Sequence, residues 1–188
     1  MTHVVLFHHA LGQTPGFHAF ADRLRAAGHE VTAPDLYAGA TFTDLDEGVA
    51  HARATGFDVV RQRGLDAAAD LPDDVVWAGM SLGLMPAQTL AQTRPGARGA
   101  LLLHGSVPPE ALGSPWPSGL PAQVHVMEHD DWGDVDDCRA LAAAQDEVEL
   151  FLYPGAGHLF TDASSVDHDP AASDLLLERV LAFLQRVG

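Results

Sequence analysis

Short apolar runs recur along the chain, and each is bounded by glycine, proline or polar residues. Because the apolar residues within a run do not alternate with polar ones, each run predicts a parallel strand covered on both faces. The chain contains six of these runs, at residues 4–7, 31–34, 75–78, 100–104, 124–127 and 148–153.

Between these runs, apolar residues recur at the three- and four-residue spacing of helices that bury one face. Thr14 and Pro15 supply an N-cap followed by proline at the first helical position, and Gly28 supplies the end of that helix. Further helices are expected at residues 46–53, 57–69, 84–94, 135–144 and 173–186. Residues 107–121 contain five prolines and two glycines, which predicts a long irregular loop over the strand ends.

Strands that alternate with helices predict an α/β fold, with a doubly wound, mostly parallel six-stranded sheet and helices on both faces. The 188 residues contain no internal repeat and no low-complexity linker, so residues 1–188 are expected to form a single domain. No apolar run is long enough to cross a membrane, and the first residues do not resemble a secretory signal.

The charge balance narrows the classes of partner. The chain has 26 acidic and 10 basic residues, every basic one an arginine, and a formal net charge of −16. Nucleic-acid binding is disfavoured because it needs clustered basic side chains. The one cysteine, Cys138, excludes an internal disulfide and suits a reducing cytoplasm. Cys138 lies within a predicted helix, where we expect a small buried residue rather than a nucleophile.

Candidate chemistry begins at residues 79–83, Gly-Met-Ser-Leu-Gly, where the third strand meets the next helix. A strand, a sharp turn and a helix around Gly-x-Ser-x-Gly are typical of a nucleophile elbow, with Ser81 at the end of the sheet. Glycine is needed at 79 and 83 because a side chain there would crowd the neighbouring strand or helix. The backbone N–H of Leu82 would point at a developing oxyanion.

A catalytic serine needs a base within hydrogen-bonding reach and a third group that orients the base. Doubly wound hydrolases supply these groups in the chain order serine, acid, histidine. In this chain an acidic loop at residues 128–132 follows the fifth predicted strand, and His158 follows the sixth. Both loops lie at the carboxyl edge of a parallel sheet, where such folds place their sites.

These segments resemble the dienelactone hydrolase family of the α/β-hydrolase superfamily, and the resemblance covers most of the chain. Residues 7–16, 33–37, 79–83 and 153–160 carry it. The most specific parts are Pro-Asp-Leu-Tyr, which begins at Pro34, and Ala-Gly-His-Leu-Phe, which ends at Phe160.

The resemblance implies an α/β-hydrolase fold and a serine hydrolase of small esters, thioesters or lactones, with no metal and no organic cofactor. In that family pattern Ser81 is the nucleophile and His158 the base. The acid comes from the loop after the fifth strand. Aligning that loop with the family favours Asp130, and sliding it by one residue would make Asp131 the acid.

The resemblance further implies oxyanion donors at the backbone N–H groups of Leu82 and Ala10. The family's founding members differ in carrying cysteine at the elbow and an acidic residue where His9 stands, and loss of the acid fits the change to serine. We therefore expect a generic small ester or lactone as substrate. The candidate substrate contacts are His9, Leu11, Trp132 and Phe160.

Other interpretations compete with a serine hydrolase and with the roles given to these residues. The chain could be a catalytically silent binding protein, since a scaffold alone does not establish a function. The eleven histidines match no metal-binding spacing, so no metal site is expected. Trp116, Trp132, Phe160 and the loop prolines would shape an apolar acyl pocket or simply pack in the core.

Asp134 is expected to cap the helix that follows it. We expect a cytoplasmic monomer or small homo-oligomer that acts on a small molecule and binds neither nucleic acid nor membrane.

Overall fold

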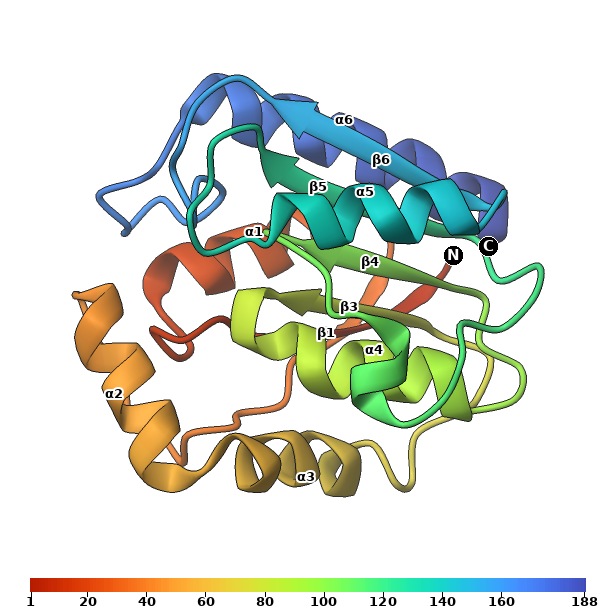
Figure 1. Ribbon diagram of the computed structural model, residues 1–188, viewed down its shortest axis with the longest axis horizontal. Helices are drawn as coiled ribbons and strands as arrows, with labels where there is room; N and C mark the ends of the chain where they lie inside the picture. Colours follow the sequence, from red (N-terminus) through yellow and green to blue (C-terminus); the bar gives the residue numbers. More distant parts are fainter.

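The computed structural model, which describes residues 1–188, is built around one six-stranded sheet with the strand order β2-β1-β3-β4-β5-β6 (Figure 1). Every neighbouring pair of strands is parallel. The strands are β1 (His3–Phe7), β2 (Glu30–Thr32), β3 (Val76–Met80), β4 (Gly99–Leu103), β5 (Ala122–Met127) and β6 (Val148–Tyr153). The predicted parallel sheet is confirmed, and it follows from runs that are apolar on both faces.

The strand order places a crevice beside β1. From β1 the chain first crosses to β2 on one side and then returns to β3 on the other side. At such a reversal the loops after the two central strands diverge, which opens a crevice at their carboxyl ends. The loops that leave β1 and β3 here carry Ala10 and Ser81.

Helices cover both faces of the sheet, as predicted. On one face lie α1 (Pro15–Ala26) and α6 (Pro170–Val187), which pack in a cluster of 20 buried residues. On the other lie α2 (Leu45–Thr55), α3 (Phe57–Ala67), α4 (Leu84–Thr93) and α5 (Val135–Ala144), whose cluster has 25 buried residues. Figure 1 shows α4 and α5 in front of the sheet and α6 behind it. No helix has the length and apolar composition needed to span a membrane.

Local sequence signals explain where helices begin. The Thr14 hydroxyl accepts a hydrogen bond from the Phe17 backbone N–H at 3.0 Å, and proline follows as the first residue of α1. The Asp44 carboxylate caps α2 in the same way. Gly56 separates α2 from α3 with a φ of +94°, a value that glycine adopts without strain. The side chains of Thr14 and Asp44 each accept from an N–H group that the start of a helix leaves without a partner.

Some predicted element ends and one predicted helix cap were wrong. The second strand ends at Thr32 rather than at Pro34, because proline has no N–H to extend the ladder. The last helix begins at Pro170 rather than at 173, because Asp169 caps it and proline suits the first position. Asp134 stands at the N-cap of α5, but its φ is +44° and its side chain makes no capping hydrogen bond.

The proline-rich loop between β4 and β5 also differs from expectation. It contains a short 3₁₀ helix, η2 (Pro109–Leu112), and lies along α4 instead of over the strand ends. The Gln88 side chain accepts from the Val107 N–H at 3.0 Å, and the Gln92 amide donates to the Pro109 carbonyl at 3.1 Å. These buried glutamines pair loop groups that have no ladder partner. Trp116 was expected either to shape an acyl pocket or to pack in the core, and it is buried in the core.

Candidate active site

Ser81 occupies a sharp turn between β3 and α4. It opens the 3₁₀ helix η1 (Ser81–Gly83) with a φ of +49°, a strained value for a residue with a side chain. A Cβ on Gly79 would lie 2.3 Å from the Gly83 carbonyl oxygen, and a Cβ on Gly83 would lie 2.4 Å from the Phe7 carbonyl oxygen. Both positions therefore require glycine, for the steric reason that the sequence suggested.

Three residues from distant parts of the chain meet at this turn. The Ser81 Oγ lies 2.7 Å from His158 Nε2, and His158 Nδ1 lies 2.8 Å from Asp130 Oδ2. Since a carboxylate can only accept, the Nδ1 must carry the proton that bonds to Asp130, which leaves Nε2 free to accept from the serine hydroxyl. The arrangement can therefore draw the proton from Ser81 when its oxygen attacks a carbonyl.

The acidic loop presents Asp130, not Asp131, to the imidazole. The Asp130 side chain is fully buried, whereas Asp131 is exposed. The second oxygen of Asp130 accepts hydrogen bonds from the backbone N–H groups of Trp132 at 2.9 Å and Gly133 at 3.1 Å. A Cβ on Gly133 would come within 2.7 Å of Asp130 Oδ2. The loop thus holds the carboxylate in one orientation.

Asp167 anchors the loop that carries His158, and sequence reasoning did not single it out. Its carboxylate accepts from the backbone N–H of His158 at 3.2 Å and lies 3.5 Å from that of Leu159. The residue belongs to a polar loop before α6, where no spacing rule distinguishes one aspartate from the next. Asp167 thereby fixes the backbone from which the imidazole projects.

Ala10 and Leu82 line the same pocket as Ser81. Ala10 follows β1, is buried, and donates its N–H to no group within the protein. A buried N–H without a partner is rare, so this group is free to bind a ligand oxygen. A Cβ on Gly48 would lie 2.3 Å from the Ala10 carbonyl oxygen, so α2 packs directly against this loop. Leu82 lies in the first helical turn after the serine, where N–H groups also lack intrahelical partners.

His9 faces away from the pocket, contrary to its assignment as a candidate substrate contact. Its side chain and that of Asp162 are fully buried, with His9 Nε2 2.7 Å from Asp162 Oδ2 in a contact poorly aligned for a hydrogen bond. Asp162 also accepts from the Thr14 hydroxyl and from the Ser164 backbone N–H. Burial alone would raise the pKa of Asp162, but the close contact with His9 and the hydrogen bonds from Ser164 and Thr14 hold that pKa well below its usual value. Asp162 therefore ties the loop after β1 to the loop after β6.

His104 is a pocket residue that sequence reasoning missed as a candidate contact. It follows β4 with a φ of +70°, is buried, and its Nε2 lies 2.8 Å from the Thr161 hydroxyl oxygen. Its ring stacks edge-on against Phe160, with ring centroids 4.9 Å apart. Burial and the neighbouring His158 lower the pKa of His104 well below its usual range, so the ring is neutral.

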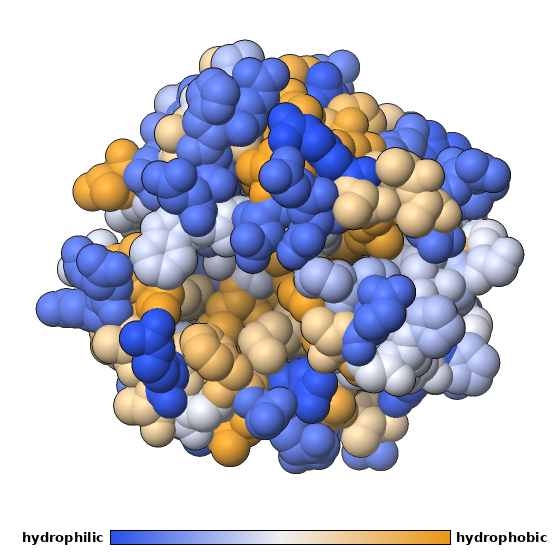
Figure 2. Space-filling model, in the orientation of Figure 1, coloured by the Kyte–Doolittle hydropathy of each residue, from blue (hydrophilic) through white to orange (hydrophobic).

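Ser81 opens into an apolar pocket. The pocket has a volume of about 310 Å³, and nine of its fifteen lining residues are hydrophobic. Figure 2 shows a hollow with apolar side chains on its floor, where Figure 1 draws the start of α4. Of the four candidate substrate contacts, only Trp132 lines this pocket. Phe160 is fully buried in the core against His104, and Leu11 is also buried.

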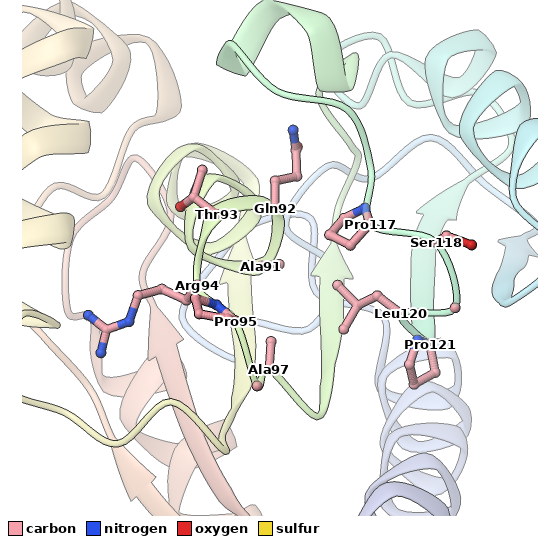
Figure 3. A pocket seen from close by; sticks show the side chains of 12 residues that line it. Ala91, Gln92, Thr93, Arg94, Pro95, Ala97, Pro117, Ser118, Leu120 and Pro121 are labelled. Atoms are coloured by element: carbon pink, nitrogen blue, oxygen red, sulfur yellow. The ribbon is translucent and has the colours of Figure 1, made fainter.

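A larger cavity lies at the opposite edge of the sheet. Its volume is about 510 Å³, and it lies between the end of α4 and the loop before β5 (Figure 3). Figure 3 shows the Arg94 side chain extending away from this cavity, where its guanidinium donates to Asp73 at 2.7 Å and to the Leu71 carbonyl at 2.7 Å. None of the groups at the Ser81 turn reaches this cavity.

The remaining reactive side chains do not form a second site. Cys138 is buried in α5, as predicted, with its sulfur 3.4 Å from the Gly133 carbonyl oxygen. Burial raises the pKa of its thiol to about 11, which keeps it protonated and weakly nucleophilic. No group of three or more histidine, cysteine, aspartate or glutamate side chains is arranged to hold a metal ion.

Comparison with known proteins gives a family match over the whole chain. The model of the dienelactone hydrolase family matches residues 1–188. A solved dienelactone hydrolase-like promiscuous phosphotriesterase from metagenomic libraries is 18% identical with a TM-score of 0.74, over 100% of this chain and 87% of that chain. A cold-adapted esterase from an Arctic intertidal metagenomic library is 18% identical with a TM-score of 0.70, over 98% of this chain and 82% of its own.

Esterase PE8 is 20% identical with a TM-score of 0.65, over 100% of this chain and 93% of its own. At these identities, the three structures demonstrate a shared α/β-hydrolase fold. No curated protein matches the chain.

Proposed function

Because the chain belongs to the dienelactone hydrolase family and is a carboxylic ester hydrolase, we propose that it cleaves small esters, thioesters or lactones by acyl transfer to Ser81. The observation that carries this proposal is the chain of short contacts from Ser81 Oγ to His158 and from His158 to Asp130. The expectation of a catalytically silent binding protein finds no support in a site whose three groups are already within reach of one another.

In the proposed first half-reaction, Ser81 Oγ attacks the carbonyl carbon while His158 Nε2 takes the serine proton. The N–H groups of Leu82 and Ala10 stabilise the negative charge that develops on the carbonyl oxygen. As the tetrahedral intermediate collapses, His158 gives its proton to the departing oxygen or sulfur, and the acyl group remains on Ser81. Asp130 holds the imidazole in the required tautomer and stabilises its positive charge.

In the second half-reaction, His158 takes a proton from a water molecule, whose oxygen attacks the acyl-serine carbonyl. Collapse of this intermediate returns the proton to Ser81 Oγ and releases the carboxylic acid. No step requires a metal ion or an organic cofactor. The apolar pocket beside Ser81 would hold the acyl or alcohol group, and its volume of about 310 Å³ is at the small end for ligand sites, which favours small substrates.

The test combines covalent labelling with turnover. A fluorophosphonate probe should label the wild-type protein at Ser81, and Ser81→Ala should lose both the label and about 10⁴-fold or more in kcat on a p-nitrophenyl ester. Ser106→Ala is a matched labelling control, because Ser106 lines the same pocket and should not be the residue that reacts. A folded wild-type protein that neither takes up the probe nor turns over any ester would favour the binding protein instead.

A further inference from the structure

The pocket beside Ser81 contains no positively charged side chain that could pair with a carboxylate. Its hydrophobic lining comes from α2, α4 and the loops around them and includes Val49, Ala52, Leu84, Met85 and Val107. The only charged side chain in the lining is that of Asp134. None of the ten arginines lines the pocket, and the chain has no lysine. The nearest arginine along the lining helix, Arg53, is exposed to solvent.

From this lining we propose that the enzyme is selective for uncharged esters with an apolar substituent, and that Asp134 excludes esters bearing a carboxylate. The inference rests on the proposed function, because it concerns the same site. A carboxylate that enters the pocket loses hydration and gains no cation in return, so its binding is penalised. An apolar substituent of the same size gains contact with the hydrophobic lining.

Asp134 is held at the pocket by strained and closely packed backbone. Its φ of +44° is uncommon for a residue with a side chain, and the carboxylate is not used to cap α5. The preceding residue, Gly133, packs against Gly105, where an added Cβ would lie 2.8 Å from the Gly133 carbonyl oxygen. Strain of this kind persists where the surrounding structure enforces it, and it gathers at functional sites.

Charges beyond the pocket act in the same direction. Asp134 also lines a neighbouring cleft, together with Glu128, Asp131, Asp136 and Asp137. Of the basic groups in that cleft, Arg139 is engaged by Asp136 at 2.9 Å. With a net charge of −16 over the whole chain, the approach of an anionic substrate is opposed before it reaches the pocket. Dienelactone itself carries a carboxylate, so the proposal predicts that it is a poor substrate.

Three p-nitrophenyl esters with the same ester group separate charge from polarity. They are the hexanoate, which ends in a methyl group, the adipate monoester, which ends in a carboxylate, and the adipamate, in which an amide replaces that carboxylate. We expect kcat/KM to fall in the order hexanoate, adipamate, adipate. The ratio of adipamate to adipate isolates the charge, because the two substrates have nearly the same size.

The size of the charge effect can be bounded from Coulomb's law. Two like unit charges about 7 Å apart shift an equilibrium about threefold at the dielectric constant of water and about sevenfold at half that value. Asp134→Asn should therefore lower the adipamate-to-adipate ratio about three- to sevenfold. Asparagine is the suitable replacement because it tolerates the left-handed backbone at this position. In the wild type, raising the salt from about 0.01 M to 1 M should lower the same ratio, since the Debye length falls from about 30 Å to about 3 Å.

Asp136→Asn is the matched control. It removes the same charge from α5, but Asp136 lines the neighbouring cleft and not the pocket beside Ser81, and it is already paired with Arg139. Its adipamate-to-adipate ratio should stay within about twofold of the wild-type value. A ratio that changes equally in both variants would show that only the total charge matters and would overturn the role of Asp134.

The inference fails if wild-type protein hydrolyses the adipate as well as the adipamate, or if salt and Asp134→Asn both leave their ratio unchanged. This failure is distinct from failure of the proposed function. Hexanoate turnover that is lost in Ser81→Ala upholds acyl transfer at Ser81 whatever the charge preference proves to be, whereas hexanoate turnover that survives Ser81→Ala overturns the mechanism itself.

Discussion

Acidification from pH 7 to pH 5 should destabilise the fold through histidines that are buried in the neutral form. Burial lowers the pKa of His8 to about 4, although its bond to the His9 carbonyl opposes this. Burial, and after it the charge of Arg179, lower the pKa of His125 to about 3. Burial also lowers the pKa of His104 well below its usual value. All three side chains are at most 1% exposed.

The hydrogen bonds of His8 explain why protonation is unfavourable there. Its Nδ1 lies 2.8 Å from the His9 carbonyl oxygen, which can only accept, so Nδ1 carries the proton. Its Nε2 accepts from the Leu36 backbone N–H at 2.9 Å. A second proton on Nε2 would face another donor and break that bond. The bond joins the loop after β1, which also carries Ala10, to the Pro-Asp-Leu-Tyr segment.

The sign of the effect follows from linkage. In the unfolded chain each histidine binds a proton near pH 6.5. In the folded chain His8 and His125 stay neutral until the pH approaches their lowered pKa values. Their contribution to the free energy of unfolding is therefore complete above pH 6.5 and is lost as the pH falls. Each such histidine costs about 1.4 kcal/mol per pH unit in this window, or about 2 kcal/mol at pH 5.

His8 and His125 together then remove about 4 kcal/mol from the free energy of unfolding at pH 5, and His104 acts in the same direction. This is a large part of the roughly 5–15 kcal/mol that stabilises a typical domain. Most carboxylates titrate below this window, since their ordinary pKa values are about 4, so the loss between pH 6.5 and pH 5 reports mainly on histidines. Asp162, whose pKa is lowered, adds its own loss only at more acid pH.

Urea unfolding at several pH values between 7 and 5, followed by tryptophan fluorescence, measures the slope of stability with pH. His125→Gln should reduce that slope by about 1.4 kcal/mol per pH unit, whatever it does to absolute stability. His18→Gln is the control for the substitution itself, because it makes the same change at an exposed position of α1. A wild-type free energy of unfolding that is constant from pH 7 to pH 5 would refute the reasoning, as would a slope that His125→Gln does not alter.

Three further predictions concern the candidate site. Asp130→Asn should lower kcat about 10⁴-fold because it favours the wrong imidazole tautomer. Asp131→Asn, at an exposed position, should lower kcat less than about tenfold. Reversed results would assign the acid to Asp131. His158→Ala should match Ser81→Ala in kcat, and the double variant should be hardly worse than either; multiplicative losses would mean that the two residues act separately. Alkylation of Cys138 should be slow and should leave most of the esterase activity, because the thiol is buried and protonated; rapid inactivation that substrate prevents would count against a serine mechanism.

Much of the fold was readable from local patterns, because each pattern expresses a short-range physical requirement. Unbroken apolar runs predicted the parallel strands, and Thr14 with Pro15 predicted the start of α1. Gly79 and Gly83 predicted a tight turn around Ser81, and both prove to be positions where a Cβ would clash with backbone. The order serine, acidic loop, histidine followed from the same reasoning about parallel sheets.

Other features depended on residues that only the tertiary structure brings together. Whether Asp130 or Asp131 meets His158 depends on a loop held by backbone N–H groups of residues 132 and 133, which no periodicity reports. The contacts of His9 with Asp162 join segments about 150 residues apart, so a motif at position 9 could not reveal that the ring faces away from the pocket.

The substrate pocket shows the same division. Composition revealed an acidic chain without lysine, but it could not tell which charges line the pocket. That is decided by the packing of α2, α4 and the loop before α5, which leaves Asp134 at the pocket and every arginine outside it. Periodicity predicts which face of an element is buried, because residues that share a face recur at a fixed spacing along the chain. The groups that a polar side chain contacts come from loops that are distant in the sequence and meet in space. Only the folded structure therefore determines these contacts.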